Sequence, residues 1–366
     1  MFTPDYRTLI LLAAVMLVAI FGALSSFWRG GDQSAGSGDP TLRRLATAAW
    51  FLSCEVWFLL IFGSSVRVNG AGLACPDWPA CFGQVVPAMD WGIALEWGHR
   101  AVAAVISILF AGLLWSIARR PDLRRDVVPW AVAAGCALSV QVILGGLTVL
   151  HLLAEWTVSS HLLVGNAFSA MVSIVALRLS ERVRPVQREG VRPVLRRLAG
   201  LLLALVAVQI FLGGWVSSSH AGLVCPNWPE CRENSFFPQW SGLVGLHLVH
   251  RLTAYALLAL AIVVAYLSWS NARIRRYACG VVGVVVAQAV LGVANVMLRL
   301  PVEVTLLHSA GAASLVLAAA WLFDELCRSP VVASSPIRSD RSLSSDFSRS
   351  NLSHPPNSQP VASEWR

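Results

Sequence analysis

The chain has 366 residues, of which 56% are hydrophobic and only 13% are charged. An average soluble domain has roughly 45 to 50% apolar and about 25% charged residues, so these values exclude an ordinary soluble protein and, for the chain as a whole, a disordered or collagen-like one. Several uninterrupted apolar runs have the length of about 20 residues that a spanning helix needs. They do not alternate as the strands of a membrane β-barrel do. The composition predicts an all-α polytopic membrane protein.

The formal charge of +8 arises from 28 basic and 20 acidic residues, and every basic residue is arginine. The arginines lie in short segments between apolar runs rather than on one face interleaved with aromatic residues. This distribution follows the positive-inside rule and argues against nucleic-acid binding.

Nine apolar segments follow one another along the chain, at 8–28, 45–66, 93–118, 128–150, 157–178, 198–217, 244–268, 278–298 and 304–326. Four arginine clusters fall on one predicted side of the membrane, within 43–44, 119–125, 178–197 and 273–276. The loops 67–92 and 218–243 lie on the other side, where arginines are few and mixed with acids. We therefore predict a multi-pass protein of the cell membrane with these two loops outside the cytoplasm.

The two ends of the chain differ from its centre. Residues 1–44 contain the first apolar segment and a polar Gly/Ser linker, which we interpret as a retained extra helix because a basic start and a clear cleavage site are lacking. Residues 328–366 are rich in Ser, Pro and Arg, and we predict a disordered cytoplasmic tail.

The centre contains an internal repeat. The sequence GAGLACPDWPAC at 70–81 recurs as HAGLVCPNWPEC at 220–231, displaced by 150 positions, and EWGHR at 96–100 is followed 151 positions later by HLVHR at 247–251. The repeat predicts a pseudosymmetric bundle of two four-helix halves, 45–178 and 198–327, joined by an Arg-rich cytoplasmic linker at 179–197. With four helices each, the halves share one orientation in the membrane.

Four histidines occupy matched depths near the outer ends of predicted helices, in two pairs: His99 with His161, and His250 with His308. Two facing helices that each offer one imidazole can hold a haem iron from both faces. The pattern predicts two bis-histidine haem sites. Zinc is disfavoured because its sites need three or four close ligands, and the loop cysteines lie away from these helices.

Charged residues accompany the predicted iron ligands. Glu96 shares a helix face with His99, and a carboxylate within the membrane is a functional candidate. The structural alternative is an ion pair of Glu96 with Arg100. Arg100 and Arg251 each follow a predicted ligand and are candidates for binding haem propionates. His247 replaces Glu96 in the second half, so only the first cavity holds an acid.

Each outer loop carries two cysteines six positions apart, Cys75 with Cys81 and Cys225 with Cys231. The oxidising compartment predicts one disulfide in each loop. They can serve as structural links or as redox-active thiols.

Together these residues resemble haem A synthases, the membrane enzymes that make the haem of aa3-type cytochrome oxidases. The resemblance covers residues 45–326 and rests on RVNGAGLACPDWP at 67–79, the Glu-x-x-His-Arg group at 96–100, and the partner histidines. The paired cysteines are similar to those of the bacterial branch. The family's eight-helix core lacks a counterpart of segment 8–28.

The resemblance implies an oxidoreductase that oxidises the methyl group of haem O to a formyl group. It also implies haem b as cofactor on His250 and His308, substrate haem at His99 and His161, and Glu96 as the catalytic acid or base. Membrane lipid, haem O synthase and cytochrome oxidase assembly factors are candidate partners, and the electron acceptor is unidentified. A dihaem electron-transfer protein, a haem transporter and a membrane thiol oxidase are the alternatives.

Arg67 breaks the repeat, because the equivalent position is Ser217. This difference suggests that Arg67 serves only the first cavity.

Overall fold

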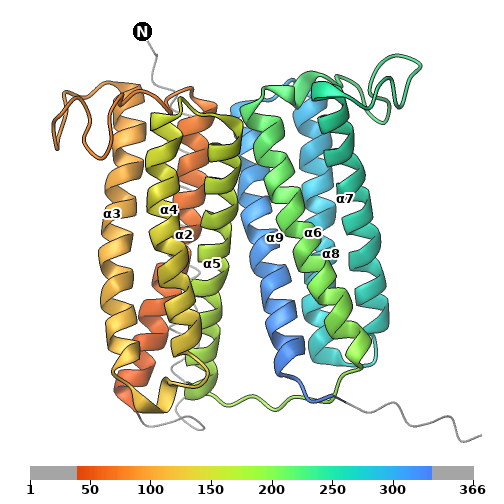
Figure 1. Cartoon of the computed structure of the whole chain (residues 1–366). Coiled ribbons are helices and arrows are strands. Elements are labelled where there is room, and N and C mark those ends of the chain that lie inside the picture. Colours follow the sequence, from red (N-terminus) through yellow and green to blue (C-terminus); the bar gives the residue numbers. More distant parts are fainter. Residues whose placement is uncertain (1–38, 332–366) are drawn as a thin grey trace, which may run out of the picture. The chain divides into compact units, whose positions relative to one another are not determined.

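The computed structural model describes residues 39–331, which form a bundle of long helices (Figure 1). In chain order they are α2 Pro40–Val68, α3 Trp91–Ala118, α4 Val128–Leu150, α5 Glu155–Val183, α6 Pro193–Ser218, α7 Gly242–Leu267, α8 Ala272–Met297 and α9 Val302–Arg328. All eight are long and apolar enough to cross a membrane. The predicted eight-helix core of a multi-pass membrane protein is confirmed. The predicted helix at 8–28 and the tail beyond residue 331 lie outside the described residues.

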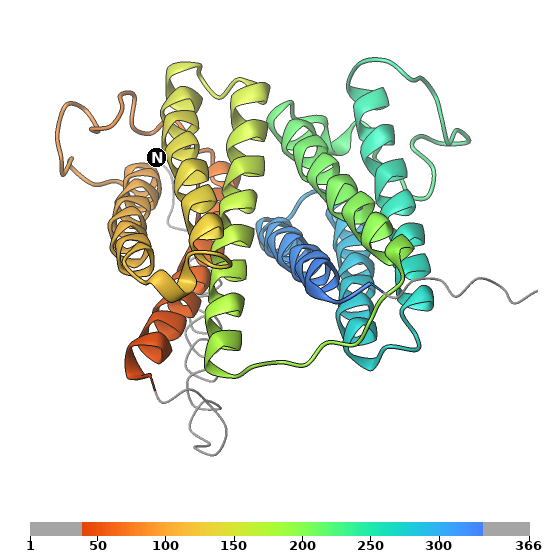
Figure 2. The ribbon, with the colours of Figure 1, turned by 60° about the horizontal axis from the view of Figure 1, so that its bottom comes forward.

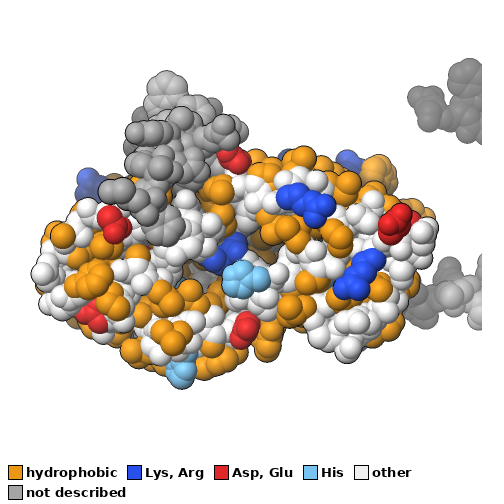
Figure 3. All heavy atoms as spheres, turned by 90° about the horizontal axis from the view of Figure 1, so that it is seen from above, with side chains coloured by type: hydrophobic (Ala, Val, Ile, Leu, Met, Phe, Trp, Pro, Cys, Tyr) orange, Lys and Arg blue, Asp and Glu red, His pale blue; other side chains and the backbone are white. Residues whose placement is uncertain are grey.

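The bundle has two distinct ends. The cysteine-loop end carries the connections 69–90 and 219–241, and the arginine-rich end is where α2, α4, α6 and α8 begin. Seen from the cysteine-loop end, charged side chains of both signs are scattered singly over the surface (Figure 3). The four arginine clusters lie in or beside the connections at the opposite end, where α2, α4, α6 and α8 begin.

The helices extend past the predicted apolar segments mainly at the arginine-rich end. α2 begins at Pro40 because proline suits the first turn and the Asp39 side chain accepts the backbone N–H of Thr41 at 2.9 Å. Asn271 caps α8 in the same way. Hydropathy marks only the part of a helix within the hydrocarbon, so it misses these capped first turns.

Helices α2 to α5 form one half and α6 to α9 the other (Figures 1 and 2). α2 packs on α3 and α5, and α6 packs on α7 and α9. Each half has its own apolar core: the rings of Phe110 and Phe168 meet 5.2 Å apart in the first, and Leu202 and Leu322 are buried in the second. The backbone repeats as well, since Gly70 and its equivalent His220 both adopt positive φ. The predicted pair of four-helix halves is thus confirmed.

The interface between the halves, formed by α2, α5, α6 and α9, contains polar contacts. The indole of Trp57 donates to the Ser314 hydroxyl at 3.2 Å, and that of Trp321 to the Ser173 hydroxyl at 2.9 Å. Buried polar groups need such partners. These two contacts fix how the halves meet.

Buried acids at the arginine-rich end explain part of the arginine excess. The side chains of Asp324 and Glu325 on α9 are only 2% exposed. Arg178 pairs with Asp324 at 2.5 Å, and Arg273 pairs with Glu325 at 2.6 Å. The sequence predicted cytoplasmic arginines only as topology signals, whereas several of them neutralise buried carboxylates.

The connection between α5 and α6, residues 184–192, runs along this same end (Figure 2). Within it Arg188 pairs with Glu181 at 2.7 Å and with Glu325 at 3.1 Å. Residues 328–331, the beginning of the predicted tail, lie beside this connection. The backbone N–H of Val191 donates to the Pro330 carbonyl at 2.8 Å. The linker is therefore bonded to both halves.

Candidate functional site

Each of the four predicted iron ligands lies in the part of its helix nearest the cysteine-loop end: His99 on α3, His161 on α5, His250 on α7 and His308 on α9. His99 and His161 lie in the first half, and His250 and His308 lie in the second. The structure thus places one predicted pair in each half. In residues 39–331, no group of three or more His, Cys, Asp or Glu could hold a metal ion.

Every one of these histidines packs against a glycine of the preceding helix. A Cβ on that glycine would approach the imidazole Cε1 to 3.0 Å for Gly63 and His99, 3.1 Å for Gly145 and His161, 3.2 Å for Gly213 and His250, and 3.4 Å for Gly292 and His308. Contacts of 3.0 to 3.4 Å leave little room for a side chain. Each glycine therefore leaves the space that its imidazole occupies, and the same contact occurs four times. We call these residues the cradle glycines: Gly63, Gly145, Gly213 and Gly292.

A glutamine lies one turn before three of the four cradle glycines. Sequence reasoning missed this pattern, although Q-x-x-L-G recurs at Gln141, Gln209 and Gln288. The amide nitrogen of Gln141 is 3.2 Å from Nε2 of His161, and that of Gln209 is 3.5 Å from Nε2 of His250. α2 has Leu59 at the equivalent position, so His99 is the one member of the set with an apolar neighbour there.

The four imidazoles fit the ligand set of a haem. Their Nδ1 atoms are all buried without a hydrogen-bond partner among the described residues. A histidine kept only for packing usually has its polar atoms satisfied. Four matched, under-satisfied imidazoles in glycine cradles between apolar helices instead suit a flat, largely apolar group whose metal binds nitrogen.

Glu96 is 4% exposed and contacts the first cysteine loop. One carboxylate oxygen accepts the backbone N–H of Cys75 at 2.8 Å, and the other accepts from Arg100 at 2.5 Å. The ion pair that sequence analysis gave as the structural alternative is therefore present. Arg100 also donates to the carbonyls of Asp77 and Ala80, each at 2.7 Å. This pair holds the loop onto α3 next to His99.

The second half contains a similar contact with different chemistry. The Nδ1 of His247, the counterpart of Glu96, is 2.8 Å from the Ala221 carbonyl. Arg251 donates to the carbonyls of Cys225 at 2.8 Å and Glu230 at 3.3 Å. Both arginines predicted to reach haem carboxylates thus also bind the loops.

Both predicted disulfides are present. Cys75 and Cys81 are joined with their Cα atoms 4.8 Å apart, and Cys225 and Cys231 with theirs 4.2 Å apart. In the first loop, backbone N–H groups of Gly83 and Phe82 bind the Asp77 carboxylate, and these bonds lower the pKa of Asp77. Each loop is therefore closed by a disulfide and held by hydrogen bonds to an arginine at the outer part of α3 or α7.

Comparison with known proteins gives the family. A model described as a cytochrome oxidase assembly protein, COX15-CtaA, matches residues 91–320, more than half of the chain and a range that includes all four histidines. The chain belongs to the COX15-CtaA family.

Several curated relatives of this COX15-CtaA protein are named Heme A synthase. The one from Shewanella oneidensis is 28% identical over 311 residues, which cover 73% of this chain and 93% of the relative. The one from Exiguobacterium sibiricum is 27% identical over 228 residues, covering 61% and 75%. The one from Brucella ovis is 27% identical over 300 residues, covering 68% and 82%. The resemblance found in the sequence motifs is confirmed.

The contacts of Arg67 differ from those expected from the sequence, where Ser217 stands at the equivalent position of the second half. Its guanidinium donates to the hydroxyl of Ser217, across the interface between the halves. Both helices that meet in this contact, α2 and α6, pack against α9, which carries His308. The expectation that Arg67 serves only the first cavity is wrong, because the guanidinium extends from α2 toward the second half.

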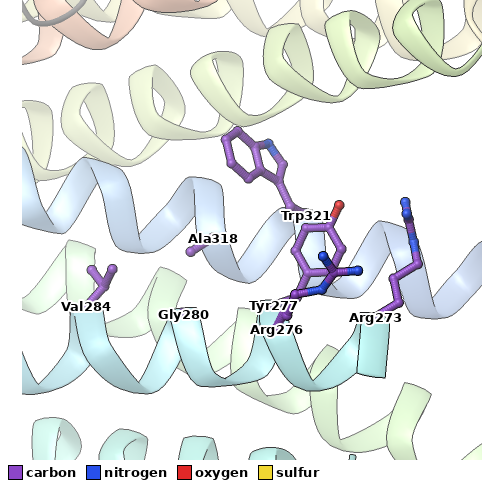
Figure 4. Close-up of a pocket in the computed structure, with 7 residues that line it drawn as sticks. All are labelled: Arg273, Arg276, Tyr277, Gly280, Val284, Ala318 and Trp321. Carbon is purple, nitrogen blue, oxygen red and sulfur yellow. The ribbon is translucent and has the colours of Figure 1, made fainter. Parts of the chain in front are cut away.

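A separate groove lies toward the arginine-rich end of α8 and α9 (Figure 4). It has a volume of about 410 Å³ and is lined by Arg273, Arg276, Tyr277, Gly280, Val284, Ala318 and Trp321. Ala318 follows His308 by ten residues, or about 15 Å along the helix axis. The groove contains no histidine and is distinct from the candidate haem sites of this COX15-CtaA protein.

The glycine cradle can be tested in the second half. Gly213→Leu would place a side chain where a Cβ alone already meets the His250 ring at 3.2 Å. Overpacking of this kind costs about 1 to 3 kcal/mol and should displace the imidazole. We expect purified Gly213→Leu to contain much less haem, measured from its absorbance per protein.

Gly283→Leu on α8 is the matched control for this variant. A Cβ at Gly283 meets nothing within 4 Å, so its haem content should stay at the wild-type level. Equal haem content in Gly213→Leu and wild type would show that the cradle does not position His250.

Proposed function

We propose that this protein is a haem A synthase, an oxidoreductase that converts the methyl group of haem O to a formyl group and so supplies haem A to aa3-type cytochrome oxidase. The observation that carries the proposal is the COX15-CtaA match over residues 91–320, which encloses both histidine pairs and Glu96. The Shewanella relative named Heme A synthase aligns over 93% of its length, so the likeness extends over nearly that whole enzyme.

We assign the second half, 198–327, to a resident haem b and the first half, 45–178, to substrate haem O. His250 and His308 would hold the cofactor, and His99 and His161 would hold the substrate. The asymmetry that supports this assignment is Glu96, whose equivalent in the second half is His247. When bound, haem b supplies a one-electron redox centre. A carboxylate that accepts protons is needed only in the half where the substrate loses them, and Glu96 lies in the first half.

Glu96 is the candidate proton acceptor of the first half. Oxidation of a methyl group removes protons as well as electrons, and a fixed carboxylate near the reacting edge can accept protons or hold water. Its two hydrogen bonds, from Cys75 and Arg100, hold the carboxylate in one place. The same contacts hold the first cysteine loop against α3, which carries His99.

Arg100 on α3 and Arg251 on α7 are proposed to bind haem carboxylates. Their described hydrogen bonds to backbone go to loop carbonyls. Each arginine therefore orients a loop directly beside a predicted iron ligand. From that position a remaining N–H group can reach a haem carboxylate.

We propose that the haem sites lie on the extracytoplasmic side of the membrane. The supporting observations are the two disulfides at the histidine end and the arginine clusters at the other end. Haem O and lipid are the expected small-molecule partners. Haem O synthase and cytochrome oxidase assembly factors are candidate protein partners.

The test is to express the chain in cells that make haem O but no haem A, and to separate the extracted haems by chromatography. We expect a new peak of haem A. A variant with His99 and His161 both replaced by alanine is the control, and it should give none. A dihaem electron carrier or a haem transporter would bind haem but leave haem O unchanged, and that result would contradict the proposal.

A further inference from the structure

Arg67 lies where the two halves meet. It is in the last turn of α2 and donates to Ser217 in the last turn of α6. The two residues are 150 positions apart, the same displacement that relates Cys75 to Cys225. Equivalent residues of two related halves can touch only near the axis between them. Arg67 therefore lies between the two candidate haem sites.

The Arg67 guanidinium has little to balance its charge. Among the ion pairs of residues 39–331, those of Arg178, Arg188, Arg273 and Arg328 engage acids at the arginine-rich end, and none involves Arg67. Its one described hydrogen-bond partner is the neutral Ser217 hydroxyl, although a guanidinium has five N–H donors. A partly buried cation among apolar helices is costly unless it is paired. This arrangement calls for an anion.

The direction of the side chain selects one of the two sites. The Arg67 guanidinium extends from α2 of the first half to Ser217 on α6 of the second half. Both α2 and α6 pack against α9, the helix that carries His308. Ser217 carries no charge and cannot provide the reciprocal contact for the first half. The free N–H groups are therefore available to the second cavity.

We propose that Arg67 is the binding site for a carboxylate of the haem held between His250 and His308. A haem carries two propionates, and the guanidinium fork matches the geometry of a carboxylate. This inference rests on the proposed function only in that the second half binds haem. It makes the second site a composite one, because a residue of the first half completes it.

The experiment compares two ligands that differ only in their carboxylates. Haemin and haemin dimethyl ester are titrated into the full-length purified protein, in a background where His99→Ala and His161→Ala remove the first site. In this background haemin should bind more tightly than its ester. Arg67→Gln should weaken haemin binding by about 10- to 100-fold, the loss expected for a charge-assisted hydrogen bond, and should leave the affinity for the ester nearly unchanged.

Two further variants and a redox measurement sharpen the result. Arg67→Lys keeps the charge without the fork and should recover part of the haemin affinity. Ser217→Ala removes the described protein partner and should retain tight haemin binding. A nearby positive charge favours the reduced iron, so Arg67→Gln should also lower the midpoint potential of the bound haem.

Equal losses for haemin and its ester in Arg67→Gln would mean that Arg67 only supports the fold of the site, and would overturn the proposal. Equal affinities of haemin and its dimethyl ester for the His99→Ala, His161→Ala protein that retains Arg67 would also overturn the proposal. If the His99→Ala, His161→Ala protein bound no haemin at all, the assignment of haem to the second half would be wrong. The proposed role of Arg67 would then be wrong as well.

Discussion

Replacing either His250 or His308 by alanine is expected to remove the stably bound low-spin haem from the purified protein. The two histidines lie on α7 and α9 near the cysteine-loop end, and each ring packs against a glycine of the preceding helix. Losing one of the two imidazoles would leave a bound haem with only one histidine to hold it. The loss should exceed the roughly 10- to 100-fold drop that is typical when only an outer partner of a metal ligand is removed. Optical spectra of the reduced and oxidised protein measure it directly.

His151→Ala is the matched control for these two substitutions. His151 is the residue after the last turn of α4; it is exposed, and its ring centroid lies 5.4 Å from that of Trp156. It should retain the wild-type spectrum. If His250→Ala and His308→Ala also kept the wild-type low-spin spectrum, the second half would not hold haem through these residues.

The helices could be predicted from the sequence because a spanning segment must be apolar over its whole length. Eight predicted segments correspond to the eight described helices, and the errors lie at the ends. There the chain leaves the hydrocarbon, and local caps such as Asp39 and Asn271 decide where a helix begins. The buried acids Asp324 and Glu325 were not foreseen, since a charge at the end of an apolar run is usually exposed.

The histidine pairs could be predicted because the duplication shows which residues occupy equivalent places. The cradle glycines were missed, because a glycine in a membrane helix has many ordinary uses and only the contact with a ring identifies this one. Arg67 was misjudged for a related reason. A repeat shows which residues correspond, but not which of them lie near the axis, where a residue of one half can serve the other.

Glu96→Gln is expected to abolish most haem A formation while the protein still inserts and binds haem b. Glutamine has nearly the same size as glutamate, and its carbonyl oxygen can still accept the backbone N–H of Cys75. It cannot accept a proton as a carboxylate does. General acid and base groups typically contribute 10²- to 10⁴-fold in rate, so the yield of haem A should fall by about 100-fold or more, with hydroxylated haem accumulating.

The contacts of Glu96 make a second measurement necessary, because the ion pair with Arg100 also holds the cysteine loop. His247→Ala removes the corresponding contact of the second half, the bond to Ala221, without touching the carboxylate, and it should be the milder change. If Glu96→Gln acted only by loosening its loop, both variants should lose thermal stability and haem A yield together. A normal haem A yield from Glu96→Gln at matched expression would reduce Glu96 to the structural partner of Arg100. A selective loss with intact haem b and an unchanged melting temperature would instead identify its carboxylate as part of the chemistry.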